Sequence, residues 1–191
     1  MKKMMCCMGL IAVMSSSMAY SAQIVSHEEQ YNIAKGFMPT SPEQSIQSLR
    51  PFLGDFRILS TQQYSQDEQA KFSPIDFAVS WGLFAHKDFA QRIHVQQYDR
   101  FLNWKMNPLP VSPQKAMQMV SNMHMIPASP EILEQLNQVK KGDLVRLQGD
   151  LVEIKDGNLV WRSSLTNTDV GEGGCELFRV KQVQWLQKVQ M

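Results

Sequence analysis

Two side chains in this sequence have the types needed for a nucleophile and its base, Cys175 and His124. A cysteine attacks as its thiolate, which a neighbouring imidazole generates and a further polar group orients. Asn122 or Asp169 could supply that orientation, and the two glycines before Cys175 could leave backbone N–H groups free for an oxyanion. The pattern therefore permits a cysteine-dependent hydrolase or transferase.

Both residues also have a structural interpretation, which we favour. Free cysteine is among the most frequently buried residue types, and Cys175 begins an apolar segment typical of a strand. His124 precedes Pro127 and could hold the end of a helix there. We accordingly expect a buried, inert Cys175, whose change to serine preserves activity, and we lean against an enzyme.

Two further groups of residues could bind a ligand without reacting. If residues 89–105 form one long strand, Tyr98, Arg100 and Trp104 share one of its faces and could stack on bases, sugars or peptides. The alternative for these three is ordinary packing beneath helices.

A hydroxyl-rich segment could likewise hydrogen-bond a sugar or a peptide. Its candidate ligand-binding residues are Ser163, Ser164 and Thr166. Serine and threonine also stabilise tight turns through bonds from side chain to backbone, and this interpretation is the simpler one.

Metal and cofactor motifs are missing from the sequence. The four histidines show neither HxH nor HxxxH spacing, and there is no CxxC pair. The sequence also contains no P-loop, no GxGxxG and no GxSxG segment. We therefore expect no metal and no cofactor.

The N-terminus has the features of a secretory signal peptide over residues 1–22. Lys2 and Lys3 precede an uncharged apolar stretch at 4–14, and small residues follow at 15–22. That stretch is too short to span a bilayer, which takes about 20 apolar residues. We expect cleavage between Ala19 and Ala22, and a periplasmic or secreted bacterial protein with no membrane span after cleavage.

Charge and cysteine content narrow the function further. The chain carries 19 basic and 18 acidic residues, and loss of Lys2 and Lys3 leaves the mature protein with a net charge of −1. Affinity for nucleic acid depends mainly on basic contacts to phosphate, so this balance disfavours nucleic-acid binding. Cys175 is the one cysteine left after cleavage, so no disulfide can form within the mature chain.

The first half of the mature chain reads as a lead followed by strands. Residues 23–55 form an irregular or helical lead, in which Ser41-Pro42-Glu43 begins a helix that Pro51 ends. Strands follow at 56–64, at 74–84, where apolar residues alternate, and at 89–105. A polar loop separates the first two.

Two helices and a β-rich end complete the mature chain. The helices begin at Ser112-Pro113, continuing to Pro127, and at Ser129-Pro130, ending near Gly142. A strand at 143–154 contains a bend or bulge at Gly149, a hairpin turn at 155–158 leads into a return strand, and a final strand occupies 175–186. We expect an α+β or mainly β fold: a small, bent, OB-like barrel over residues 56–191, with a helical insertion between strands.

Three segments of the sequence carry a resemblance to a known family. They are SNMHMIPA at 121–128, SSLTNTDVGEGGCE at 163–176 and DFAVSWG at 76–82. Together they are similar to stretches of a family of uncharacterised exported bacterial proteins, over about residues 70–185. The resemblance implies a single exported domain and assigns no catalytic role.

These observations favour a soluble binding or adaptor protein of the bacterial cell envelope. Its partner would be an envelope protein, a peptide or a glycan. A cysteine-dependent enzyme using Cys175 and His124 is the alternative, and a single-strand nucleic-acid binder is the third hypothesis.

Overall fold

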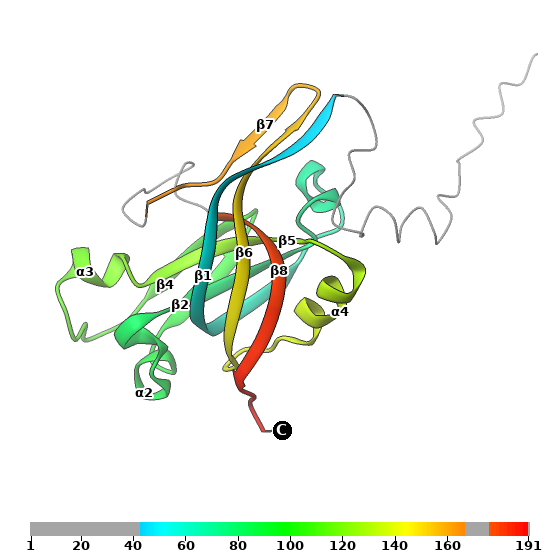
Figure 1. Cartoon of the computed structure of the whole chain (residues 1–191). Helices are drawn as coiled ribbons and strands as arrows, with labels where there is room; N and C mark the ends of the chain where they lie inside the picture. The colour runs from blue at the N-terminus through cyan, green and yellow to red at the C-terminus, as the bar shows by residue number, and fades with distance from the viewer. Residues whose placement is uncertain (1–42, 167–175, 191) are drawn as a thin grey trace, which may run out of the picture.

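The chain folds into a mainly β structure, as the sequence predicts. Residues 43–166 and 176–190 are described in this computed structural model (Figure 1). The strands are β1 (Gln44–Gln63), β2 (Ile75–Ser80), β3 (His94–Tyr98), β4 (Phe101–Lys105), β5 (Val120–Pro127), β6 (Leu144–Asp156), β7 (Leu159–Arg162) and β8 (Glu176–Gln187). The helices are the 3₁₀ turns η1 (Glu68–Lys71) and η2 (Gly82–Ala85), and α2 (Lys87–Ala90), α3 (Pro113–Met117) and α4 (Pro130–Gln138). None of them is long and apolar enough to cross a membrane.

Five of these strands close into a ring. Their order is β1-β2-β5-β8-β6, and β6 pairs back with β1. The β5–β8 pair is parallel, and every other pair in the ring is antiparallel. The hairpin of β6 and β7 projects beyond the ring together with the start of β1 (Figure 1), while β3 and β4 form a separate two-stranded sheet.

The first strand is long because it pairs with β6 along its first part and with β2 along its second part. Residues 44–57 of β1 pair with β6, and residues 57–63 pair with β2. The helix predicted from Ser41-Pro42-Glu43 to Pro51 is therefore wrong, and β1 runs through the boundary predicted at residue 55. A local capping signal contributes about 1 kcal/mol, which a ladder to β6 outweighs.

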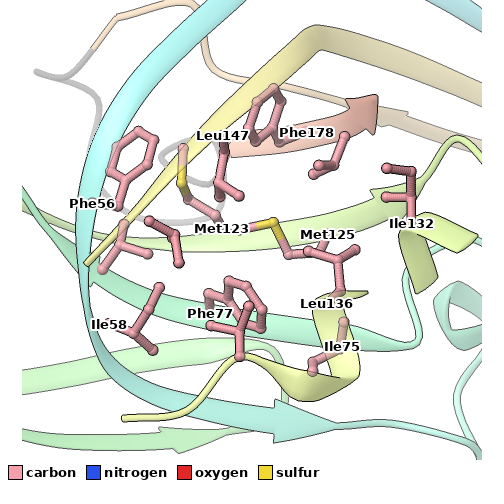
Figure 2. Packing of buried hydrophobic residues seen from close by; sticks show 14 of the residues in the cluster. Phe56, Ile58, Ile75, Phe77, Met123, Met125, Ile132, Leu136, Leu147 and Phe178 are labelled. Atoms are coloured by element: carbon pink, nitrogen blue, oxygen red, sulfur yellow. The ribbon is translucent and has the colours of Figure 1, made fainter. Parts of the chain in front are cut away.

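The inside of the ring holds the main hydrophobic core. Side chains from opposite walls meet there, and Ile132 and Leu136 of α4 pack against them (Figure 2). The largest fully buried members are Ile58, Phe77, Met123, Met125, Leu136, Leu147, Leu151 and Phe178.

The helix predicted at Ser129-Pro130 is confirmed, since the Ser129 side chain accepts a hydrogen bond from the backbone N–H of Ile132.

The outer surface of β1 and β2 is covered by an insertion at residues 81–119. A second apolar cluster joins Leu59 and Ala78 of the ring to Phe84, Ile93 and neighbouring residues of the insertion. All of β2 is therefore buried, although its alternating sequence predicted a half-buried strand.

Residues 112–127 are less helical than the sequence predicts. The helix beginning at Ser112-Pro113 ends at Met117, and Val120–Pro127, predicted to continue that helix, forms β5. Pairing with both β2 and β8 explains this difference, because a central strand satisfies its backbone on two sides.

Two glycines occupy the positions that the sequence predicts. The β6–β8 register shifts at Gly149, where an added Cβ would lie 1.9 Å from the carbonyl oxygen of Arg179. Gly157 lies in the turn between β6 and β7 with φ +57° and open space around it. The bulge and the hairpin turn are both confirmed.

The different constraints on these glycines predict different responses to substitution. Gly149→Ala should lower the free energy of unfolding by about 2 kcal/mol, because the backbone of β8 must move. Gly157→Val should lower it by about 1 kcal/mol or more, through the positive φ alone. Urea denaturation measures both, with Val160→Ala on the exposed side of β7 as a control, and an unchanged Gly149→Ala would contradict the close approach.

Candidate functional site

The three sequence segments that stand out come together on β2, β5 and β8. Asp76 lies directly opposite His124, and Met123 lies beside Glu176 in the β5–β8 pair. The Ser121 hydroxyl is hydrogen-bonded to the Glu176 carboxylate. Residues far apart in sequence thus meet at one region of the ring.

The outer side of this region is a polar cluster around Asp76. This carboxylate is fully buried. Its Oδ1 accepts a hydrogen bond from Arg100 Nη1 at 2.9 Å, and its Oδ2 accepts one from Asn122 Nδ2 at 3.2 Å. The Asn122 amide also donates to the backbone oxygen of Arg100 and accepts from Gln97 at 2.8 Å. Asn122 therefore links β5 to the β3–β4 hairpin.

Arg100 holds that hairpin against the ring. Its guanidinium donates to both carboxylate oxygens of Asp67, at 2.8 and 3.2 Å, and to the backbone oxygen of Ser73 at 2.9 Å. The same group stacks over the Tyr64 ring at 3.7 Å. Burial, reinforced by the charge of Asp76, raises the pKa of the Tyr64 phenol.

The long strand predicted at 89–105 is wrong, because a tight turn divides it. Asp99 and Arg100 adopt φ values of +47° and +68°, which is the conformation of a two-residue hairpin turn. The proposed stacking residues consequently do not share a face. Tyr98 is exposed, Arg100 is buried in the turn, and Trp104 packs edge-on against Phe84 in the insertion core.

His124 is buried between the polar cluster and an indole. Its Nδ1 lies 2.9 Å from Asp76 Oδ1, and its ring centroid lies 4.8 Å from that of Trp161. The two groups are in close contact, although their arrangement does not meet hydrogen-bond geometry. Asn122 bonds to the hairpin rather than to this imidazole. Cys175 and Asp169 lie outside the described residues, so the buried, inert Cys175 stays a prediction and the catalytic arrangement stays its alternative.

The inner side of the same region opens into a cavity of about 410 Å³. Its apolar walls come from Phe52, Phe56, Trp81, Met123, Leu151 and Leu165, and its other lining residues are Arg50, Leu53, Gly54, Asp55, Ser164, Thr166 and Glu176. No residue of α4 is among them, and Phe56 lies across the core from Ile132 (Figure 2). We call this space the ring-end cavity.

The three hydroxyl residues proposed to bind a ligand lie in two different surroundings. Ser164 and Thr166 line the ring-end cavity. Ser163 does not line it: its hydroxyl donates to the backbone oxygen of Ser164 at 2.8 Å and accepts from the Leu177 N–H at 3.1 Å. The Ser164 hydroxyl also donates to the backbone oxygen of Thr166 at 2.7 Å, which is the turn-stabilising role.

The comparisons with known proteins supply no family. No protein-family model matches the chain, and no curated protein is detectably similar to it. Within residues 43–166 and 176–190, no group of three or more histidine, cysteine or acidic side chains is arranged to hold a metal ion.

Strand β1 contributes to the cavity, which the sequence did not predict. Residues 50–55 belong to the predicted N-terminal lead, yet five of them line the space, and Phe56 lines it from the start of the strand predicted at 56–64. The spacing of Phe52, Gly54 and Phe56 is the period of two expected of a strand, and it is the signal that could have revealed them.

The polar cluster predicts a large penalty for losing its guanidinium. Arg100→Ala should lower the free energy of unfolding by about 3 kcal/mol, because it leaves Asp76 buried without its cation. Arg146→Ala is the matched control, since its bidentate pair with Asp55 is exposed and should cost less than about 1 kcal/mol. Urea denaturation of both variants checks this, and equal losses would show that the buried pair has no special role.

Proposed function

We propose that this protein is an exported binding protein of the bacterial cell envelope, which holds an apolar group of its ligand in the ring-end cavity. The observation that carries the proposal is the cavity itself, where residues from all three distinctive segments meet. The signal-like features of residues 1–22 support export. The resemblance that we propose for residues 121–128 and 163–176 points to the same location.

We further propose that the ring is an OB-like barrel. Its strands β6, β1, β2 and β5 follow the spatial order of a Greek key, and β8 completes five strands, as in this fold. OB-fold barrels bind ligands on the face of their second and third strands, here β2 and β5. The insertion covers the outer side of β2, so the ring-end cavity is the better candidate for ligand binding.

The cavity favours an apolar group carried by a partly polar ligand. Its volume lies within the range of about 300–1,000 Å³ that small-molecule sites occupy. Phe52, Phe56 and Trp81 supply aromatic walls, while Ser164 and Glu176 supply polar atoms that could orient a ligand. A peptide side chain fits this lining better than a glycan, whose hydroxyls would face apolar walls unpaired.

Filling the cavity tests this function. Leu165→Trp replaces a leucine side chain that lines the cavity with a bulkier indole. It should reduce the affinity for the uncharged fluorophore N-phenyl-1-naphthylamine at least tenfold. Val160→Trp is the matched control, because Val160 is 63% exposed on β7 and is not a lining residue. Fluorescence titration measures the affinity, and thermal unfolding checks that both variants fold.

The expected outcome is saturable binding by one fluorophore per chain, lost in Leu165→Trp and kept in Val160→Trp. Absence of saturable binding to the unaltered protein, or equal affinity in both folded variants, would contradict the proposal.

A further inference from the structure

The part of β1 that lines the ring-end cavity pairs with a strand on one side only, as far as residues 43–166 and 176–190 are concerned. Residues 44–57 pair with β6 on one side, and β2 takes up the other side only from Arg57 onward. In the described chain, no strand pairs with that second side before Arg57. A free edge of this kind presents backbone donors and acceptors to a partner.

The direction of each backbone group along this edge follows from the two backbone hydrogen bonds of Ile58. The N–H of Ile58 donates to the Asp143 oxygen at 2.9 Å, and its oxygen accepts from the Gly142 N–H at 2.7 Å. Successive residues of a strand turn their backbone groups to opposite sides, and the β1–β6 register is unbroken from Arg50 to Arg57. Leu53 and Asp55 therefore direct their N–H and C=O groups away from β6.

Pro51 agrees with this assignment. A proline has no N–H to donate, so within a sheet it occupies positions whose nitrogen faces away from a neighbouring strand. Pro51 has the same parity as Leu53 and Asp55, which places its nitrogen on the free side. The usable edge thus begins after Pro51 and ends at Arg57, where β2 begins to pair.

The side chains along the edge leave it open. Leu53 is 60% exposed, so an apolar side chain lies open to solvent on this edge. Gly54 carries no side chain, and a Cβ there would lie 2.4 Å from the Phe56 ring. The Asp55 carboxylate is held by Arg146 through two bonds of 2.7 and 2.8 Å, which lower its pKa and offset its charge.

We propose that the ligand is a peptide in extended conformation, which adds a strand to β1 at Leu53 and Asp55 and inserts one apolar side chain into the ring-end cavity. In this mode of recognition, main-chain hydrogen bonds give affinity and pockets for alternate side chains give specificity. Arg50 and Phe52–Phe56 line the cavity from this same stretch, so edge and cavity form one continuous site. This inference rests on the proposed function, and it adds the ligand class and its orientation.

The inference is tested by selecting peptides that bind the protein and then measuring which backbone amides of the protein they protect from hydrogen exchange. A phage-displayed library of random ten-residue peptides is selected against the full mature protein. For the tightest synthetic peptide, hydrogen exchange measured by NMR should slow at least tenfold at the Leu53 and Asp55 amides. The peptide should also displace N-phenyl-1-naphthylamine.

Methylated peptides provide the matched control. N-methylation of the peptide amides that face β1 should abolish binding, while N-methylation of the alternate amides should leave affinity within about threefold. Equal effects of the two patterns, or bound peptides that leave the Leu53 and Asp55 amides exchanging freely, would overturn the inference.

The remaining outcomes separate this inference from the function on which it rests. If the fluorophore binds but no selected peptide competes with it, the proposal of a peptide ligand is wrong, while the proposal that the ring-end cavity binds an apolar group is supported. If neither binds, both proposals fail. Slow exchange at Leu53 and Asp55 in the free protein would mean that this chain or a second copy already covers the edge, which also overturns the inference.

Discussion

A buried carboxylate organises the outer half of this structure. Asp76 is fully removed from solvent, and an uncompensated charge in that position would be too costly to retain. Arg100 and Asn122 satisfy its oxygens, and His124 lies against it. Because Arg100 comes from the β3–β4 turn, satisfying this one group also docks the hairpin on the ring.

The docked insertion covers one face of the ring and leaves the ring-end cavity uncovered. The cluster around Phe84 and Ile93 lies over Ala78 of β2, so that face of the ring is packed rather than open. At the other side of the same strands, β1 leaves β6 for β2 only at Arg57 and frames the ring-end cavity before that point. The insertion thus covers the outer surface of β1 and β2, whereas the first part of β1 borders the ring-end cavity.

The sequence predicts elements that depend on neighbouring residues and misses those that depend on distant ones. The helix at Ser129-Pro130 and the turn at Gly157 are set by local capping and backbone geometry, and they were predicted. The bulge at Gly149 was predicted from a glycine inside an apolar strand, although its close contact is to the distant Arg179. The start of β1 was predicted as a helix, since its partner β6 lies about a hundred residues away. Of the residues that line the cavity, Ser164 and Thr166 were ligand-binding candidates because of their hydroxyl groups, whereas the lining residues of β1 at 50–55 were not predicted.

The most direct test of ligand binding at the ring end is methionine-methyl NMR. Met123 lines the ring-end cavity, whereas Met106 is buried in the insertion core. With ¹³C-methyl methionine in the mature protein, titration of N-phenyl-1-naphthylamine should shift the Met123 methyl resonance saturably and leave that of Met106 in place. A bound fluorophore that shifts Met106 and leaves Met123 unmoved would contradict the account.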